Sequence, residues 1–134
     1  MFGRSPESWP RLRDAGAKRQ GDGALVQRIA SKVGERTILL DVARITHFTA
    51  KDKLTFAVVN GREHAIDPTL NDLEQRLDAR RFLRIHRSTI LNLSFVSELY
   101  PGIDGMIVRL KDDRGTELRV ARDRVRVLKD RLGI

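Results

Sequence analysis

Residues 82–92 read FLRIHRSTILN, and this stretch decides how the rest of the chain is interpreted. Side chains in a strand alternate between two faces, so Leu83 and Ile85 share an apolar face. Arg84 and His86 share the opposite, polar face. The alternation breaks after His86, and apolar residues resume only near the end of the stretch. The pattern predicts two short strands joined by a loop or bulge that directs the residues between them outward.

The rest of the chain has the spacing of an all-β fold. From residue 25 onward, short apolar stretches recur about every eight to twelve residues, separated by Gly, Asp, Asn or Pro. Asn60-Gly61 is a strong hairpin signal, and Asp113-Arg114-Gly115 indicates a second tight turn. The predicted strands are 28–33, 36–40, 45–49, 54–59, 63–66, 83–85, 89–92, 96–99, 106–110 and 117–120.

Two segments have the periodicity of helices. Leucines repeat at helical spacing in 70–77, where Thr69 can act as the N-cap. Apolar residues share one face of 123–132, and Gly133 follows as a stop signal. The sequence therefore predicts a mainly β fold of about ten short strands, with one short internal helix and one C-terminal helix.

The composition predicts one ordered domain at 24–134. Residues 1–23 contain prolines and glycines without apolar periodicity, which predicts a flexible tail or linker. The chain has no cysteine, no signal-peptide pattern, and no apolar run near the ~18 residues that cross a bilayer. We therefore expect a cytoplasmic domain without disulfides.

Residues that could serve in an enzyme or metal site are present, but their spacing is not that of such a site. His47, His64 and His86 are far apart and lack the spacing of metal ligands. Asp112-Asp113 resembles a carboxylate pair but lies beside a turn glycine, which favours a solvated turn. No glycine-rich phosphate loop is found in the sequence. We expect no enzyme activity, no catalytic residue, no metal site and no cofactor.

The net charge is compatible with a protein that binds polyanions. The chain carries +8, and residues 1–23 hold five basic and three acidic residues, which leaves +6 for 24–134. A cationic surplus on a folded domain favours DNA, RNA or an acidic membrane. An ordinary solvated basic surface can have the same charge, so the positions of the cations must distinguish a binding surface from a solvated one.

Cationic side chains gather in three segments. The first, 49–53, is a polar turn between two predicted strands, and the second is the interrupted pattern at 80–92. The third, 119–126, leads into the C-terminal helix, whose first amides attract anions. Arginine can donate to guanine edges, and histidine and serine can donate to phosphate oxygens. A charged turn or an arginine-rich solvated edge is the alternative for each segment.

The block FLRIHRS, with its surroundings, resembles the LytTR DNA-binding domain of bacterial response regulators. A strand ending in EHAI and the predicted helix 70–77 precede it. FVSEL, a last hairpin and VARDRVRVLKDRL follow it. The resemblance covers 28–132, nearly all of the predicted domain.

The resemblance implies an elongated β–β–β sandwich that binds double-stranded DNA through loops in successive major grooves. It implies a two-component transcription regulator that occupies paired direct repeats, with weak self-association on DNA. The chain is expected to be either a stand-alone regulator or part of a longer protein with an N-terminal signalling domain. Lys53, Arg87 and Arg122 are the predicted base contacts, and Lys51, His86, Ser88, Arg84 and Arg124 are the predicted contacts to the DNA backbone.

Two other functions remain open from the residues alone. An RNA-binding β domain would use the same charge, but such domains usually present stacking aromatics. The chain has one Trp, one Tyr and five Phe, most of which fit a core. A protein-interaction module that docks an acidic partner is the second alternative.

Overall fold

The computed structural model describes residues 26–134 as ten strands, two α-helices and three short 3-10 turns. The strands are β1 (Arg28–Val33), β2 (Arg36–Asp41), β3 (His47–Lys51), β4 (Leu54–Val59), β5 (Arg62–Ile66), β6 (Phe82–His86), β7 (Thr89–Asn92), β8 (Val96–Gly102), β9 (Gly105–Leu110) and β10 (Glu117–Arg119). The helices are α1 (Leu70–Arg76) and α2 (Val125–Leu132), and the 3-10 turns are η1 (Val42–Arg44), η2 (Leu93–Phe95) and η3 (Arg122–Arg124).

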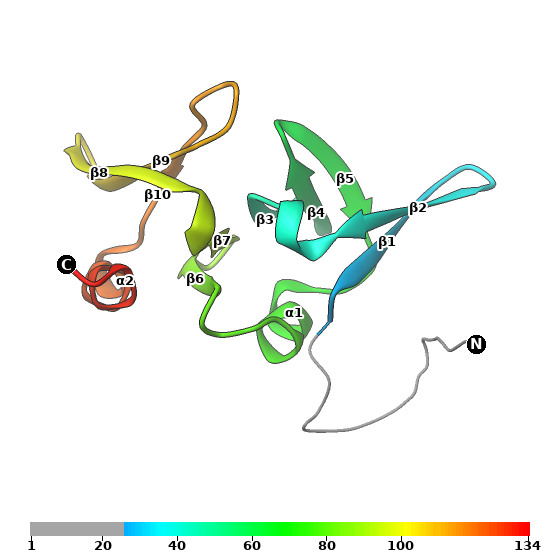
Figure 1. Ribbon diagram of the computed structural model, residues 1–134, viewed down its shortest axis with the longest axis horizontal. Helices are drawn as coiled ribbons and strands as arrows, with labels where there is room; N and C mark the ends of the chain where they lie inside the picture. The colour runs from blue at the N-terminus through cyan, green and yellow to red at the C-terminus, as the bar shows by residue number, and fades with distance from the viewer. Residues whose placement is uncertain (1–25) are drawn as a thin grey trace.

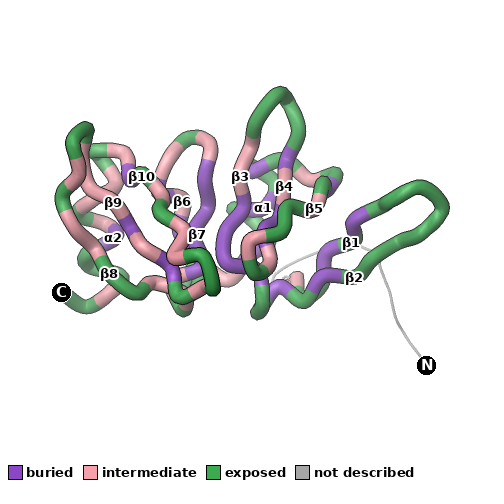
Figure 2. The backbone as a smooth tube through the Cα atoms, turned by 90° about the horizontal axis from the view of Figure 1, so that it is seen from above, coloured by how far each residue is buried: buried purple, intermediate pink, exposed green. Residues whose placement is uncertain are grey.

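Three antiparallel sheets follow one another along the long axis of the molecule (Figure 1). The central sheet has five strands in the order β5-β4-β3-β7-β6. The β1–β2 hairpin lies at one end, where the Ser31 hydroxyl donates to the Ala65 carbonyl oxygen at 2.8 Å. A three-stranded sheet, in the order β10-β9-β8, lies at the other end together with α2. Figure 2 shows that the tip of β1–β2 is exposed, whereas much of β3, β6 and β7 is buried.

The β6–β7 hairpin separates two hydrophobic cores and contributes to both. Phe82 and Ile90 belong to the core shared with α1 and β1–β5. Leu83, Ile85 and Leu91 belong to the core shared with β8–β10 and α2. Because both faces of the hairpin are covered, all four residues of β7 are buried. The predicted alternation in β6 is therefore observed, with each face packed against a different half of the molecule.

Each helix closes one of these cores. In α1, Leu70, Leu73 and the C-cap Leu77 are buried in the first core, and a capping box between Thr69 and Asp72 fixes the first turn. In α2, Leu128 is buried in the second core. Gly133 ends α2 in a left-handed conformation at φ 78°, which glycine adopts without steric strain.

Two tight turns have the left-handed backbone of hairpin loops. Asn60 and Gly61 have φ values of 48° and 83°, which confirms the predicted Asn-Gly hairpin between β4 and β5. Asp52 and Lys53, between β3 and β4, have φ values of 54° and 66°. Positive φ at two successive non-glycine residues is uncommon and sets the direction in which their side chains leave the turn.

The mainly β fold with two helices is confirmed, and three of the ten predicted strands have the predicted bounds. The third strand was predicted at 45–49 but lies at His47–Lys51, because η1 occupies the residues before it and Asp41 caps that turn. The last helix was predicted at 123–132, but its first residues form η3. The predicted tail at 1–23 lies outside the described residues. Within 26–134, no helix is long and apolar enough to cross a membrane.

Candidate nucleic-acid interface

The three segments with predicted functional residues meet at the β6–β7 hairpin. On one side of this hairpin, the Ala50 amide of β3 donates to the Ser88 carbonyl oxygen at 2.9 Å. On the other side, the Ala121 amide before η3 donates to the Ile85 carbonyl oxygen at 2.7 Å. We call the surface formed by residues 51–53, 86–88 and 122–124 the loop face.

The two lysines of the β3–β4 turn differ in their contacts. Lys51 Nζ lies 2.6 Å from a carboxylate oxygen of Glu63 on β5 and 5.5 Å from the centre of the Phe56 ring. Lys53 is exposed and forms no ion pair with any residue between 26 and 134. The ammonium group of Lys53 is therefore the more available of the two.

His86 and Ser88 hold the β6–β7 turn closed. The Ser88 amide donates to His86 Nδ1 at 3.2 Å, and the Ser88 hydroxyl lies 2.9 Å from the same nitrogen. Because a backbone N–H can only donate, Nδ1 is the acceptor and the neutral ring carries its proton on Nε2. Nε2 is therefore the nitrogen of His86 that can donate to a ligand.

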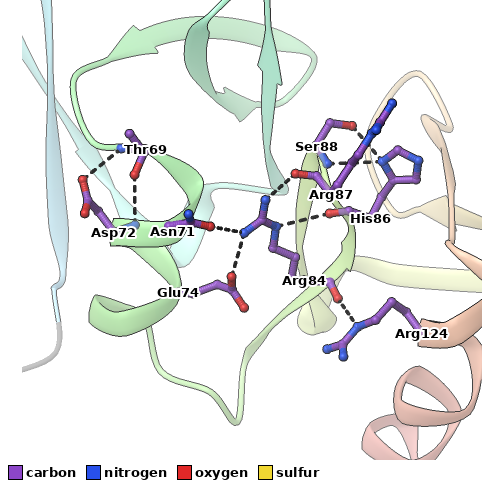
Figure 3. Close-up of polar contacts among 9 residues, drawn as sticks. All are labelled: Thr69, Asn71, Asp72, Glu74, Arg84, His86, Arg87, Ser88 and Arg124. Carbon is purple, nitrogen blue, oxygen red and sulfur yellow. Dashed lines mark hydrogen bonds and ion pairs between the residues drawn. The ribbon is translucent and has the colours of Figure 1, made fainter.

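Arg87 is exposed at the tip of this turn. Its side chain extends away from Arg84 and from α1 in Figure 3. In the described part of the chain, only its backbone carbonyl takes part in a hydrogen bond to a side chain, that of Arg84. The guanidinium group is thus free to donate to a ligand in bidentate geometry.

Arg84 is placed differently, with its guanidinium held among protein acceptors (Figure 3). Nη1 donates to Asn71 Oδ1 at 2.6 Å and to Glu74 Oε1 at 2.7 Å, both on α1. Nε donates to the His86 carbonyl oxygen at 3.3 Å, and Nη2 donates to the Arg87 carbonyl oxygen. The side chain is only 20% exposed. A guanidinium has five N–H donors, so these four contacts leave one N–H without an acceptor among the described residues.

The η3 segment supplies two further arginines. Arg122 is exposed and makes no side-chain hydrogen bond within residues 26–134. Arg124 is half-buried, and its Nε donates to the Arg84 carbonyl oxygen at 2.8 Å. Its terminal nitrogens donate to no described residue. Of the eight predicted DNA contacts, Lys53, Arg87 and Arg122 thus present unpaired charged groups, while Lys51 and Arg84 are paired with protein acceptors.

Asn71 and Glu74 are contributors that the sequence analysis did not identify. They are three residues apart and therefore share one side of α1, the side that contacts Arg84. This spacing was the available signal, but it does not reveal which strand the helix packs against.

The comparisons with known proteins agree with one another. A family model described as the LytTr DNA-binding domain matches residues 35–133. The heme-containing CO-sensing transcriptional regulator RcoM 1 of Paraburkholderia xenovorans (strain LB400) is 34% identical over 99 residues, which cover 74% of this chain and 37% of that protein. Sensory transduction protein LytT of Bacillus subtilis (strain 168) is 25% identical over 122 residues, which cover 91% of this chain and 50% of that protein.

A solved structure gives the same result for the fold. It is described as a LytTr DNA-binding domain of a methyl-accepting/DNA response regulator from Bacillus cereus. The match has a TM-score of 0.72 at 22% identity and covers 81% of this chain and 99% of that one. The chain spans half or less of the curated relatives named above. The family match extends from β2 through α2 and includes the whole loop face. The resemblance seen in the sequence is confirmed, and the chain belongs to the LytTR DNA-binding domain family.

Proposed function

We propose that the loop face binds double-stranded DNA sequence-specifically, with its three loops entering successive major grooves. The observation that carries this proposal is the pair of backbone hydrogen bonds, Ala50 to Ser88 and Ala121 to Ile85, which tie the three loops to one hairpin. A rigid hairpin keeps the spacing of the loops constant, as reading a fixed sequence requires.

The chemistry of the loop face suggests a division of roles. Arg87 and Arg122 are exposed arginines suited to bidentate donation to guanine, and Lys53 is the third proposed base contact. His86 Nε2 and the terminal nitrogens of Arg124 are proposed to hold phosphates. Ser88 is a proposed backbone contact of lower weight, because its single hydroxyl hydrogen is directed at His86 Nδ1. Lys51 remains a proposed backbone contact of lower weight, because Glu63 occupies its ammonium group. Arg84 was predicted to contact the DNA backbone too, but its guanidinium is occupied by protein acceptors.

The regulatory role is proposed by analogy with the relatives. RcoM 1 is described as a transcriptional regulator, and LytT as a sensory transduction protein. We infer that this domain directs a bacterial transcription regulator to paired direct repeats, with weak self-association on DNA. We further propose that a signalling domain elsewhere in the protein controls it.

The test is selection of bound duplexes from a random pool, followed by binding measurements on the selected sequence. Arg87→Ala and Arg122→Ala should each weaken binding to that duplex by roughly 1–3 kcal/mol and relax base preference at separate positions. Arg36→Ala is the matched control, because Arg36 is exposed on the distant β1–β2 hairpin. Failure to enrich any duplex, or preference for single-stranded RNA in competition, would contradict the proposal.

A further inference from the structure

Arg84 contacts the elements on both sides of β6. Its side chain contacts α1 and the β6–β7 turn, and its backbone carbonyl accepts from Arg124. We propose that Arg84 is a positioning residue that fixes the orientation of Arg87 and the place of η3, and that it is not itself a DNA contact. This inference rests on the proposed function of the loop face.

The Arg84 side chain holds the backbone on both sides of Arg87. The His86 carbonyl belongs to the peptide group before Arg87, and the Arg87 carbonyl belongs to the peptide group after it. Both accept from the Arg84 guanidinium. Peptide groups are planar, so fixing both of them fixes φ and ψ of Arg87 and thus the direction of its side chain.

The Arg84 side chain is itself held by α1. β6 and β7 change register between Arg84 and His86, so the regular ladder does not define the end of the hairpin. Asn71 and Glu74 on α1 supply the anchoring acceptors, at 2.6 Å and 2.7 Å. The capping box that fixes the first turn of α1 holds these two acceptors in place. The orientation of Arg87 is therefore set from α1, through Arg84.

The backbone of Arg84 also contacts η3, which belongs to another loop of the loop face. Arg124 Nε donates to the Arg84 carbonyl oxygen at 2.8 Å, directly beside the hydrogen bond from Ala121 to Ile85. These two bonds attach η3 to the free edge of β6. A shift of Arg84 would thus displace the loop that carries Arg122 as well as the turn that carries Arg87.

A lysine at position 84 cannot make the contacts that Arg84 makes. The four acceptors of the Arg84 side chain lie on two elements, α1 and the β6–β7 turn, and the planar guanidinium reaches all four from three nitrogens. An ammonium group presents its three donors from a single atom. Arg84→Lys therefore retains the positive charge but loses most of the positioning contacts. The variant thus distinguishes a DNA contact made through the charge from a positioning role.

The experiment compares the full chain with four variants, Arg84→Lys, Arg84→Ala, Glu74→Ala and Asp67→Ala, on the selected duplex and on a scrambled duplex of equal length. Arg84→Lys should reduce the ratio of specific to non-specific affinity roughly tenfold, with non-specific affinity and salt dependence unchanged. Glu74→Ala should reduce the same ratio by a smaller factor. Removal of a negative charge would by itself raise the affinity for both duplexes, so a lower ratio reports the loss of the contact to Arg84. Asp67→Ala is the matched control, because it removes an exposed carboxylate that does not contact Arg84. Its ratio should equal that of the wild type.

Thermal unfolding and titration of the active fraction ensure that only folded protein is compared. A wild-type ratio in folded Arg84→Lys would overturn the inference while the proposed function stands. Arg84→Ala that weakens both duplexes equally and lowers the salt slope by about one would overturn it too, because that is the signature of a phosphate contact. If the wild-type chain selects no duplex, the proposed function fails and this inference fails with it.

Discussion

At the scale of single residues, Lys51 and Lys53 differ in whether the ammonium group has a protein partner. Lys51 is paired with Glu63, and an exposed pair of this kind contributes under about 1 kcal/mol to stability. Lys53 has no such partner among the described residues and occupies a left-handed position at φ 66°. The two lysines therefore offer a matched test within one turn.

We predict that Lys53→Gly weakens binding to the selected duplex by about 1–3 kcal/mol, while Lys51→Ala has a clearly smaller effect. Glycine adopts a left-handed backbone without steric strain, so Lys53→Gly removes the ammonium group and keeps the turn. Titration of labelled duplex with each variant measures both values. Equal losses from the two substitutions would show that the ion pair to Glu63 does not restrain Lys51.

A second residue-scale prediction concerns the buried His47. The Thr46 hydroxyl donates to the Val58 carbonyl oxygen at 3.1 Å and lies 3.0 Å from His47 Nδ1. The Thr46 oxygen therefore accepts from Nδ1–H. Burial lowers the pKa of His47 from 6.5 to about 4, although the charges of Asp112 and Glu63 oppose this shift. Between these two values the unfolded chain binds a proton that the folded chain excludes.

The free energy of unfolding should therefore fall as the pH falls from 6.5 towards 4, by at most about 3 kcal/mol from this residue. Urea unfolding at several pH values across that window measures the loss. His47→Gln keeps a neutral polar side chain and should flatten the dependence within the window. A pH dependence in His47→Gln as steep as that of the wild type would contradict the assignment.

At the scale of elements, the β6–β7 hairpin is both the wall between two cores and the support of the loop face. Ile90 and Leu91 are neighbours in sequence but lie in different cores, at 1% and 0% exposure. Ile90→Ala and Leu91→Ala should each lower the free energy of unfolding by roughly 2–5 kcal/mol, as measured by denaturant unfolding. Leu54→Ala, at a residue 53% exposed, is the control and should change it by less than about 0.5 kcal/mol. A loss below about 1 kcal/mol for either core variant would contradict the two-core arrangement.

The same hairpin shows what can and cannot be predicted from the sequence. The alternation of Leu83 and Ile85 with Arg84 and His86 was sufficient to predict strand β6 and its turn. It could not reveal that α1 covers the polar face of Arg84, because the partners Asn71 and Glu74 come from an earlier element. Periodicity describes one strand at a time, whereas the role of an outward residue depends on which element packs on that face.

Strand β3 illustrates a second cause of error. Ile45 and Thr46 are fully buried and read as the start of a strand, but they lie between η1 and β3. The Asp41 side chain accepts from the Ala43 amide and starts the 3-10 turn that delays the strand. Local capping thus shifted the boundary, while the apolar pattern itself was correct.

At the scale of the whole molecule, ion pairs and free cations are unevenly distributed. On the three-stranded sheet, Arg109 pairs with Glu98 and Glu117, and Arg119 pairs with Asp104. On the loop face, Lys53, Arg87 and Arg122 have no such partners in the described part of the chain. The paired sheet presents a nearly neutral surface, so the net charge of +6 on residues 24–134 lies mainly on other elements.

This asymmetry predicts a strong dependence of binding on salt. If the loop face and its surroundings neutralise about six phosphates, log K should fall with log[salt] at a slope of about −5. Binding of the selected duplex at salt concentrations from about 50 to 200 mM gives this slope. Arg124→Ala should lower its magnitude by about one, because one phosphate contact is lost. Arg119→Ala, on the paired sheet, should leave it unchanged. A wild-type slope between roughly zero and −2 would mean that few phosphates are neutralised, and the loop face could not be the contact surface.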